Sequence, residues 1–399
     1  MHTMAIEAGI GTSTARDHIL AVKEAVSEAR LNLGKDKIDL VFIFSSAEFA
    51  HPGVLKLIEQ ALGPLPVLGC SGFAVISSRG ITKHGLVIML LSLPEGIYLN
   101  TAHIKEISRR SSLSAGEELG EKLLYGFRSV QRSLSIIFSD GLLKDSSELI
   151  NGLQERLGRS FPLVGASSSD NLAFERTSVY CGQEVSSDSC CGLLLGGKLN
   201  FGLGVKHGWK PLGKPRRVTA SKGNTVVQID NTCAVKIYED YFSRSVSELK
   251  KDLKRISTLY PIGIYLSGED EYLLRNISSI EEDGSLVFQG NIPQDSQVRL
   301  MIGTKESCLN ATHQAAEEVR KNLSGHKINF LLVFDSVSRY ILLGRQAEKE
   351  LEAIQEEIGR DTPLVGVYTY GEQAPLRGIN YLGRTYFHNQ TVTILGIAG

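Results

Sequence analysis

Two tyrosines and a glutamate stand close together near the C-terminal end of the chain. In the stretch TPLVGVYTYGEQAP, residues 362–375, Tyr368, Tyr370 and Glu372 follow directly after a short apolar run. Phenol and carboxylate groups gathered at the end of a strand can line a pocket and orient a polar ligand. Because bulky polar residues are not typical of turns, we expect this cluster, together with Gly371, to bind a ligand.

Other apolar runs of the sequence also end in small polar residues. These residues are Cys70 and Ser71, Ser139, Asp170 at the end of a serine-rich segment, and Asp335. Ligands of open α/β sheets bind beyond the carboxyl ends of the strands, so these tips are candidate binding residues. The alternative is that serine and glycine only form the turns and cap helices. A further alternative is an enzyme that uses Cys70 as a nucleophile, if nearby amides lower the pKa of its thiol.

The spacing of histidines and cysteines gives no metal site. Nine histidines are dispersed, and the six cysteines form no CxxC pair, so a site with several such ligands is not expected. No Walker-type phosphate loop, GxSxG, HExxH or EF-hand motif occurs, so the sequence predicts a protein that is not an enzyme. A haem needs only one axial histidine, and His388, just before an apolar run, is the candidate for that role.

The candidate residues belong to a pattern that occurs three times. Each copy has an apolar run ending in Phe and small polar residues, then an amphipathic stretch, then proline and a second apolar run ending in glycine. The runs are DLVFIFSS and LPVLGCSG, SIIFSDG and FPLVGASSSDN, and NFLLVFDS and TPLVGVYTYGE. Continuously apolar runs are typical of strands covered on both faces, and proline ends the helix before the second strand. Each copy therefore predicts a β-α-β unit.

The pattern extends on both sides of each copy and sets the expected fold class. A further helical stretch precedes each copy and a third apolar run follows it. We therefore expect an α/β protein of repeated β-α-β-α-β units, with mixed sheets covered by helices, in two associated modules. A different segment, about residues 200–297, has alternating strand patterns and one helical stretch near 246–253. The expected modules are residues 1–222, with two repeats, and residues 223–399, with this segment and the third repeat.

Composition limits the class of protein and its partners. The 399 residues are 42% hydrophobic and 22% charged, as in globular proteins. With 43 basic and 44 acidic residues the net charge is −1, so we expect neither nucleic acid nor a membrane as partner. The apolar runs are too short to span a bilayer, no secretory signal is evident, and the scattered cysteines favour the reducing cytoplasm.

The C-terminal motif resembles that of the FIST proteins. VGVYTYGEQAPL followed by FHNQTVTILGI is similar to the family's G-x-Y-T-Y-G-E segment and H-N-x-T strand. RRVTASKGNTVVQID and DEYLLRNISSIEEDGSLVFQGNIP, which includes Arg275, resemble earlier parts of the same C-terminal module. PVLGCSGFAVIS and PLVGASSSDN are similar to the N-terminal module. Where the family often has Cys-x-Gly-Arg, this chain has Ser336-Val337-Ser338-Arg339, and GCSGFAVIS lacks the family's glutamate.

The resemblance implies a sensory module for signal transduction that takes small molecules such as amino acids. We therefore expect a small-molecule binder that signals through a separate protein. In this interpretation Arg339 binds a carboxylate, Glu372 binds an ammonium or hydroxyl, and the tyrosines line the pocket with Asp335 and Asn389. The resemblance also leaves a haem-based nitric-oxide sensor open as an alternative. Another possibility is that Arg339 and Glu372 pair with each other and only brace the fold.

Overall fold

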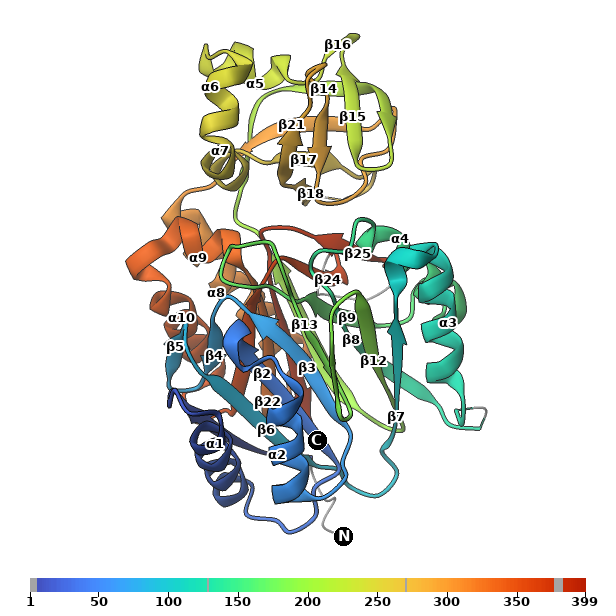
Figure 1. The fold of residues 1–399 in the computed structure, drawn as a ribbon, viewed down its shortest axis with the longest axis vertical. Helices are drawn as coiled ribbons and strands as arrows, with labels where there is room; N and C mark the ends of the chain where they lie inside the picture. The colour runs from blue at the N-terminus through green and yellow to red at the C-terminus, as the bar shows by residue number, and fades with distance from the viewer. Residues whose placement is uncertain (1–5, 128, 270, 377–382) are drawn as a thin grey trace.

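The protein has a large body and a smaller lobe at one end of it (Figure 1). The computed structural model describes residues 6–127, 129–269, 271–376 and 383–399. The lobe comprises residues 210–302, and the chain passes between the two parts after β13 (Asn200–Lys206) and before α8 (Lys305–Asn322). The expected mixed α/β class is confirmed. Within the described ranges, no helix has the length and apolar character needed to cross a membrane.

The described residues of the body form three six-stranded sheets. The order of the first is β1 (Glu7–Ser13), β6 (Leu86–Ser92), β2 (Leu40–Ser46), β3 (Val67–Gly72), β10 (Val179–Cys181), β11 (Glu184–Ser186). The order of the second is β25 (Thr385–His388), β24 (Gly371–Pro375), β9 (Leu163–Ser167), β8 (Arg132–Ser139), β12 (Ser189–Gly196), β7 (Tyr98–Lys105). The order of the third is β13, β26 (Val392–Ala398), β22 (Ile328–Ser336), β23 (Leu364–Thr369), β4 (Val75–Ser77), β5 (Gly80–Thr82).

Each sheet has one parallel pair at its centre, and a helical connection joins the two strands of that pair. The pairs are β2 with β3, β8 with β9, and β22 with β23. The connections are η1 (Ala47–Phe49) with α2 (Pro52–Leu62); α4 (Ser146–Leu157); and α9 (Val337–Leu343), η3 (Gly344–Gln346) and α10 (Glu348–Ile358). The remaining described pairings of the three sheets are antiparallel, so all three sheets are mixed.

The three sheets exchange strands in a cycle, which the sequence did not predict. The hairpin β4–β5 follows β3 of the first sheet but pairs with β23 in the third. The hairpin β10–β11 follows β9 but pairs with β3, and β24–β25 follows β23 but pairs with β9. At one crossing, a Cβ on Gly72 would lie 2.0 Å from Val367 Cγ2. No sheet is therefore built from one stretch of the chain alone.

The core lies where the three sheets face one another. Phe44, Phe138 and Phe334 come from the first parallel strand of each sheet, and their ring centroids are 5.5 to 6.2 Å apart. Helices cover the outside of the body (Figure 1). These are α1 (His18–Leu33), α3 (Ser112–Leu124) and α8, with α2, α4 and α10; the short η2 (Ile107–Arg109) precedes α3. Burial on both sides explains why the central strands are apolar throughout.

The lobe has its own sheet and its own apolar core. Its strands are β14 (Lys210–Lys222), β15 (Thr225–Ile229), β16 (Thr232–Cys233), β17 (Ile262–Tyr265), β18 (Tyr272–Arg275), β19 (Ile277–Ile280), β20 (Leu286–Phe288) and β21 (Gln297–Ile302). Its helices are α5 (Lys236–Phe242), α6 (Val246–Lys251) and α7 (Leu253–Leu259). The module boundary expected after residue 222 falls at the end of β14. It therefore separates β14 from β15, two strands that pair with each other within the lobe.

Candidate functional site

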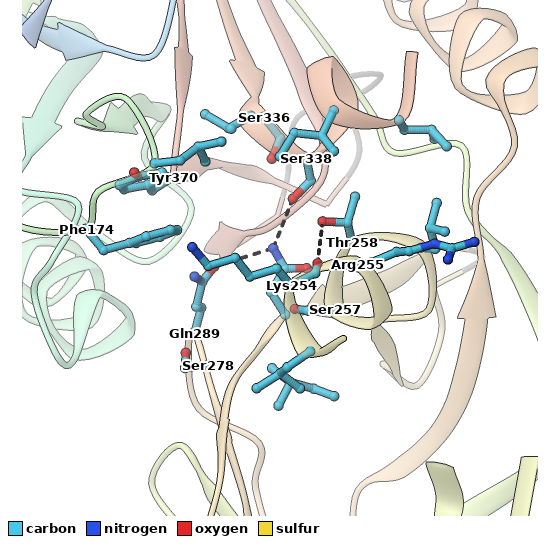
Figure 2. Close-up of a pocket in the computed structure, with 18 of the residues that line it drawn as sticks. Phe174, Lys254, Arg255, Ser257, Thr258, Ser278, Gln289, Ser336, Ser338 and Tyr370 are labelled. Atoms are coloured by element: carbon cyan, nitrogen blue, oxygen red, sulfur yellow. Dashed lines mark hydrogen bonds between the residues drawn. The ribbon is translucent and has the colours of Figure 1, made fainter. Parts of the chain in front are cut away.

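A cavity of about 830 Å³ lies between the lobe and the body. The lobe contributes α7, the start of β19 with the preceding Asn276, and Gln289 after β20; the body contributes α9 and the ends of β22 and β23 (Figure 2). Its lining residues are Leu172, Phe174, Leu253, Lys254, Arg255, Ser257, Thr258, Leu259, Asn276, Ile277, Ser278, Gln289, Ser336, Val337, Ser338, Ile341, Leu342, Thr369 and Tyr370. The cavity thus lies at the carboxyl ends of parallel strands, where α/β sheets place their ligands.

One wall of the cavity is a pair of stacked aromatic rings. The rings of Phe174 and Tyr370 are 4.4 Å apart between centroids and nearly parallel, with 7° between their planes. Figure 2 shows both rings on the same side of the cavity. Phe174 keeps 41% of its surface exposed, so this wall offers an open aromatic surface to a ligand.

Asp170 holds this wall in place. Its carboxylate accepts a hydrogen bond of 2.5 Å from the Tyr370 hydroxyl and accepts further bonds from the backbone amides of Phe174 and Glu175. Burial raises the pKa of Asp170, but these hydrogen bonds outweigh it and lower the pKa below its ordinary value. Burial and then the Asp170 carboxylate raise the pKa of Tyr370. Asp170 therefore stays charged and positions the aromatic pair without lining the cavity itself.

Side-chain amides in and beside the cavity lining connect the lobe to the body. The amide nitrogen of Asn276 donates to Gln289 Oε1 at 3.4 Å and to Ser338 Oγ at 3.3 Å. Asn389 donates to the same Gln289 oxygen at 3.4 Å, and Gln390 donates to the backbone oxygen of Ser257 at 2.9 Å. Distances of 3.3 to 3.4 Å are long for hydrogen bonds from an N–H group to an oxygen. The lining amides can therefore turn toward a ligand at a low cost in free energy.

The charged side chains of the lining are both cations. Lys254 Nζ lies 5.8 Å from the centroid of the Phe174 ring, while Arg255 is 3.9 Å from Asp252. Among the lining residues there is no aspartate or glutamate. The electrostatic potential of the cavity therefore favours an anionic group of a ligand.

Arg339 is not available to a ligand, which corrects the role expected from the sequence. Its side chain is fully buried and forms ion pairs with Asp335 at 2.9 Å and Glu350 at 2.5 Å. The Tyr368 hydroxyl donates to the other oxygen of Glu350 at 2.9 Å. Burial and then Glu350 raise the pKa of Asp335, against the effect of Arg339. Because these charged groups pair with one another away from the cavity, they brace α9 and α10 against β22 and β23.

Glu372 and Gly371 also lie behind the cavity surface. The Glu372 carboxyl is fully buried and accepts hydrogen bonds from the hydroxyls of Thr369 at 2.9 Å and Thr391 at 2.8 Å. Burial raises its pKa to about 8. A Cβ on Gly371 would lie 2.3 Å from the ring of Phe387. Glu372 does not pair with Arg339, and it cannot reach a ligand ammonium unless the strand ends move.

The N-terminal candidates are buried and have structural partners. Cys70 is fully buried, and this burial raises the pKa of its thiol, opposite to what a nucleophile needs. Ser71 Oγ donates to the backbone oxygen of Ser169 at 2.8 Å, and Ser139 Oγ is 2.9 Å from Ser167 Oγ. None of these side chains lines the cavity. The Ser71 bond joins β3 of the first sheet to the segment that follows β9 of the second, whereas Ser139 and Ser167 join neighbouring strands of one sheet.

The surroundings of His388 do not fit an axial haem ligand. Its ring is 2% exposed, and its Nε2 lies 3.0 Å from the backbone oxygen of Ala374. Burial lowers the pKa of His388 to about 3. The lining of the cavity includes neither histidine nor cysteine, and the described residues form no group of three or more metal-ligating side chains. His388 is therefore not placed to bind a haem in the cavity.

Of the predicted binding residues, Tyr370 lines the cavity, and Asp170 and Asn389 support its walls. The sequence did not predict the lining residues Phe174, Lys254, Asn276, Gln289 and Ser338. One signal was available: NISSI, which begins with Asn276, directly follows Arg275 in a segment that resembles the FIST C-terminal module. Lys254 and Phe174 carried no such signal. Lys254 is one of several lysines in a helical stretch, and Phe174 is a single aromatic residue in a loop.

Comparisons with known proteins place the chain in a family. Residues 39–232 match the FIST N domain, and residues 234–375 match the FIST C domain. An uncharacterized protein of Methanocaldococcus jannaschii, MJ1623, is 25% identical over 297 residues, which is 70% of this chain and 56% of that protein. The chain thus matches little more than half of the length of this relative.

Solved structures give weaker similarities. A cyanuric acid hydrolase is 9% identical with a TM-score of 0.37, covering 99% of this chain and 100% of that one. The cyanuric acid hydrolase of A. caulinodans is 10% identical with a TM-score of 0.39, covering 98% and 99%. Similarities at this level assign no activity. The matches to the two domain models cover most of the sequence, and the chain therefore belongs to the FIST family.

Proposed function

We propose that this chain is a non-enzymatic sensory protein that binds a small organic molecule in the cavity between lobe and body and signals through a separate protein. FIST domains are sensory domains of signal transduction proteins. The observation that carries the proposal is the position of the cavity. One ligand there contacts α7 of the lobe, α9 of the body and the loop that holds Phe174.

The connection between the two parts gives a physical route for a signal. The chain passes between lobe and body only at residues 207–209 and 303–304 of the described chain. A ligand that contacts both parts favours the arrangement in which the contacts are complete, and it shifts the population toward that arrangement. A partner protein that recognises the resulting lobe position would then respond to the ligand.

The chemistry of the lining supports binding more than catalysis. The hydroxyls of Ser257, Ser336 and Ser338 line the cavity without a histidine, cysteine or carboxylate among the lining residues to activate them. For an amino acid, the carboxylate would lie near Lys254 and the ammonium near the oxygen of Gln289. This assignment replaces the roles first expected of Arg339 and Glu372. An intracellular setting belongs to the same proposal, because the six cysteines are free thiols.

A thermal unfolding screen tests the proposal. Purified protein is unfolded in the presence of amino acids, small carboxylates, aromatic acids and haem, each at high excess. A ligand at a hundred times its dissociation constant stabilises the protein by about 2.7 kcal/mol, which raises the melting temperature by a few degrees. We expect at least one such shift.

A pair of variants then locates the bound compound. Ile341 lines the cavity with 45% of its surface exposed, and Ile19 on α1 is 63% exposed outside it. Ile341→Trp should fill the cavity and abolish the shift, while Ile19→Trp should leave it unchanged. A shift that survives in Ile341→Trp would place the ligand elsewhere, and a screen without any shift would refute the sensor proposal.

A further inference from the structure

If the cavity is the sensory site, its lining also selects the class of ligand. The first selection is by charge. Lys254 extends from α7 into the cavity, and no carboxylate of a described residue lies within ion-pair distance of its ammonium. The nearby acid Asp170 is already engaged by the Tyr370 hydroxyl and by backbone amides. A carboxylate of the ligand is thus the missing partner of Lys254.

The second selection is by shape. The Phe174 ring stacks on Tyr370 with one face and has 41% of its surface exposed. Lys254 Nζ lies over the same ring. A flat aromatic group can stack on the exposed Phe174 surface, because aromatic rings favour offset parallel packing. The apolar side chains of Val337 and Ile341 on α9 line the same cavity.

The backbone around Phe174 shows that its exposure is built into the fold. Leu172 and Phe174 both have left-handed φ angles, 71° and 56°, which are unfavourable for residues with a Cβ. The Asp170 carboxylate accepts hydrogen bonds from the amides of Phe174, Glu175 and Arg176 and so holds this conformation. A strained loop that places an apolar ring at a cavity surface indicates a binding role for that ring.

The third selection is by size and by the polar end of the cavity. At about 830 Å³ the cavity is in the upper part of the range of small-molecule sites, so a two-ring compound fits and a small acid such as acetate leaves most of it empty. Asn276, Gln289 and Ser338, which line the same cavity, supply both hydrogen-bond donors and acceptors. These groups can bind a polar substituent of the aromatic body.

We propose that the ligand is a planar aromatic carboxylate, bound with its carboxylate at Lys254 and its ring against Phe174. This inference rests on the proposed function, because it names the ligand class of the same cavity. It goes beyond the sequence expectation of a small polar molecule, and it assigns Lys254 and Phe174 as the residues that determine specificity.

Three probes separate the contributions of charge and ring. 2-Naphthoate has both features, 2-naphthamide has the ring without the charge, and hexanoate has the charge without the ring. Calorimetric titration at low salt should show 2-naphthoate binding about tenfold more tightly than either of the others, because each lost contact is of the size of one charged hydrogen bond or one aromatic stack.

Two variants assign these contributions to residues. Lys254→Met should weaken 2-naphthoate and hexanoate about tenfold and leave 2-naphthamide unchanged. Phe174→Leu should weaken the two naphthalene compounds and leave hexanoate unchanged. Lys250→Met, on the exposed surface of α6 outside the cavity, is the matched control and should change none of them. Unchanged melting temperatures without ligand would show that the variants fold.

The outcomes separate this inference from the proposed function. Equal affinity for naphthoate and naphthamide, or equal losses in the Lys254 and Lys250 variants, would overturn the assigned ligand class. If instead a non-aromatic amino acid binds and Ile341→Trp abolishes its binding, the ligand class is wrong while the sensor proposal stands. If neither the probes nor the screened compounds bind, both proposals fail.

Discussion

Glu372 is a buried acid that adjoins the cavity wall without lining it. Its carboxyl lies behind Thr369, whose hydroxyl donates to it, and Thr369 itself lines the cavity. Its pKa is raised to about 8 from an ordinary value of 4.5, with burial as the largest cause. At neutral pH the folded protein therefore keeps a proton on this carboxyl that the unfolded chain has released.

This difference predicts how stability depends on pH. Between about pH 5 and pH 8 the folded state binds more protons at Glu372, so its contribution to the free energy of unfolding falls as the pH rises, by on the order of 3 kcal/mol. Glu372→Gln removes the titration, and its amide can donate to Thr369, whose hydroxyl then reaches the backbone oxygen of Gly371 at 3.3 Å.

Denaturant unfolding at pH 5 and pH 8 measures the effect. When the pH is raised from 5 to 8, the free energy of unfolding of Glu372→Gln should increase relative to that of the natural sequence. An equal difference at both pH values would show that Glu372 is already ionised in the folded protein.

Single residues were only partly predictable from the sequence. Tyr370 could be found because a bulky polar residue at a strand end is unusual. The burial of Arg339 could not, because its partner Glu350 lies on a different helix and the fold alone brings the two together. Lys254 could not be distinguished from other surface lysines, because its position over Phe174 depends on a contact between distant parts of the chain.

At the scale of elements, Arg275 at the end of β18 holds the lobe against the body. Its guanidinium donates to the backbone oxygens of Phe387 at 2.8 Å, Leu274 at 2.9 Å and Asn291 at 3.1 Å. Burial lowers its pKa to about 9. Gly290 has φ +127°, and a Cβ there would lie 2.9 Å from Arg275 Nε, which explains the glycine at this position.

Removing this contact should loosen the lobe. Arg275→Met loses the bond to Phe387 of the body, at a cost of about 1.5 to 3 kcal/mol for a charged hydrogen bond. We expect proteolysis under native conditions in the segments that join lobe and body to become at least about tenfold faster, since cleavage follows the population of the opened form. Arg299→Met on β21 is the control with the same substitution. Equal cleavage of both variants would mean that Arg275 stabilises only the lobe.

The elements themselves were more predictable than their arrangement. The runs before Ser46, Ser139 and Ser336 form β2, β8 and β22, because continuous burial leaves a clear apolar signal. The short hairpins β4–β5 and β10–β11 have strands of three residues, and each pairs with a strand from a different copy of the repeat, β23 and β3 respectively. Local pattern carries no information on such pairings, so the exchange of strands appeared only in the structure.

At the scale of the whole molecule, the body is a cycle of three interlocked sheets and the lobe is a separate core joined to it. The interlocked body gives α9 and the strand ends fixed positions, whereas the lobe carries α7 on two connections. The cavity lies where the two parts meet. This arrangement suits a protein in which a small ligand controls the position of a lobe.

Hydrogen–deuterium exchange with and without a bound compound tests this central claim most directly. A ligand in the cavity should slow amide exchange together in α7, in α9 and in the loop that holds Phe174, three segments that are distant in the sequence. Exchange in α1, on the outside of the body, should not change. Protection confined to one of the three segments, or found only elsewhere in the chain, would contradict a ligand site between lobe and body.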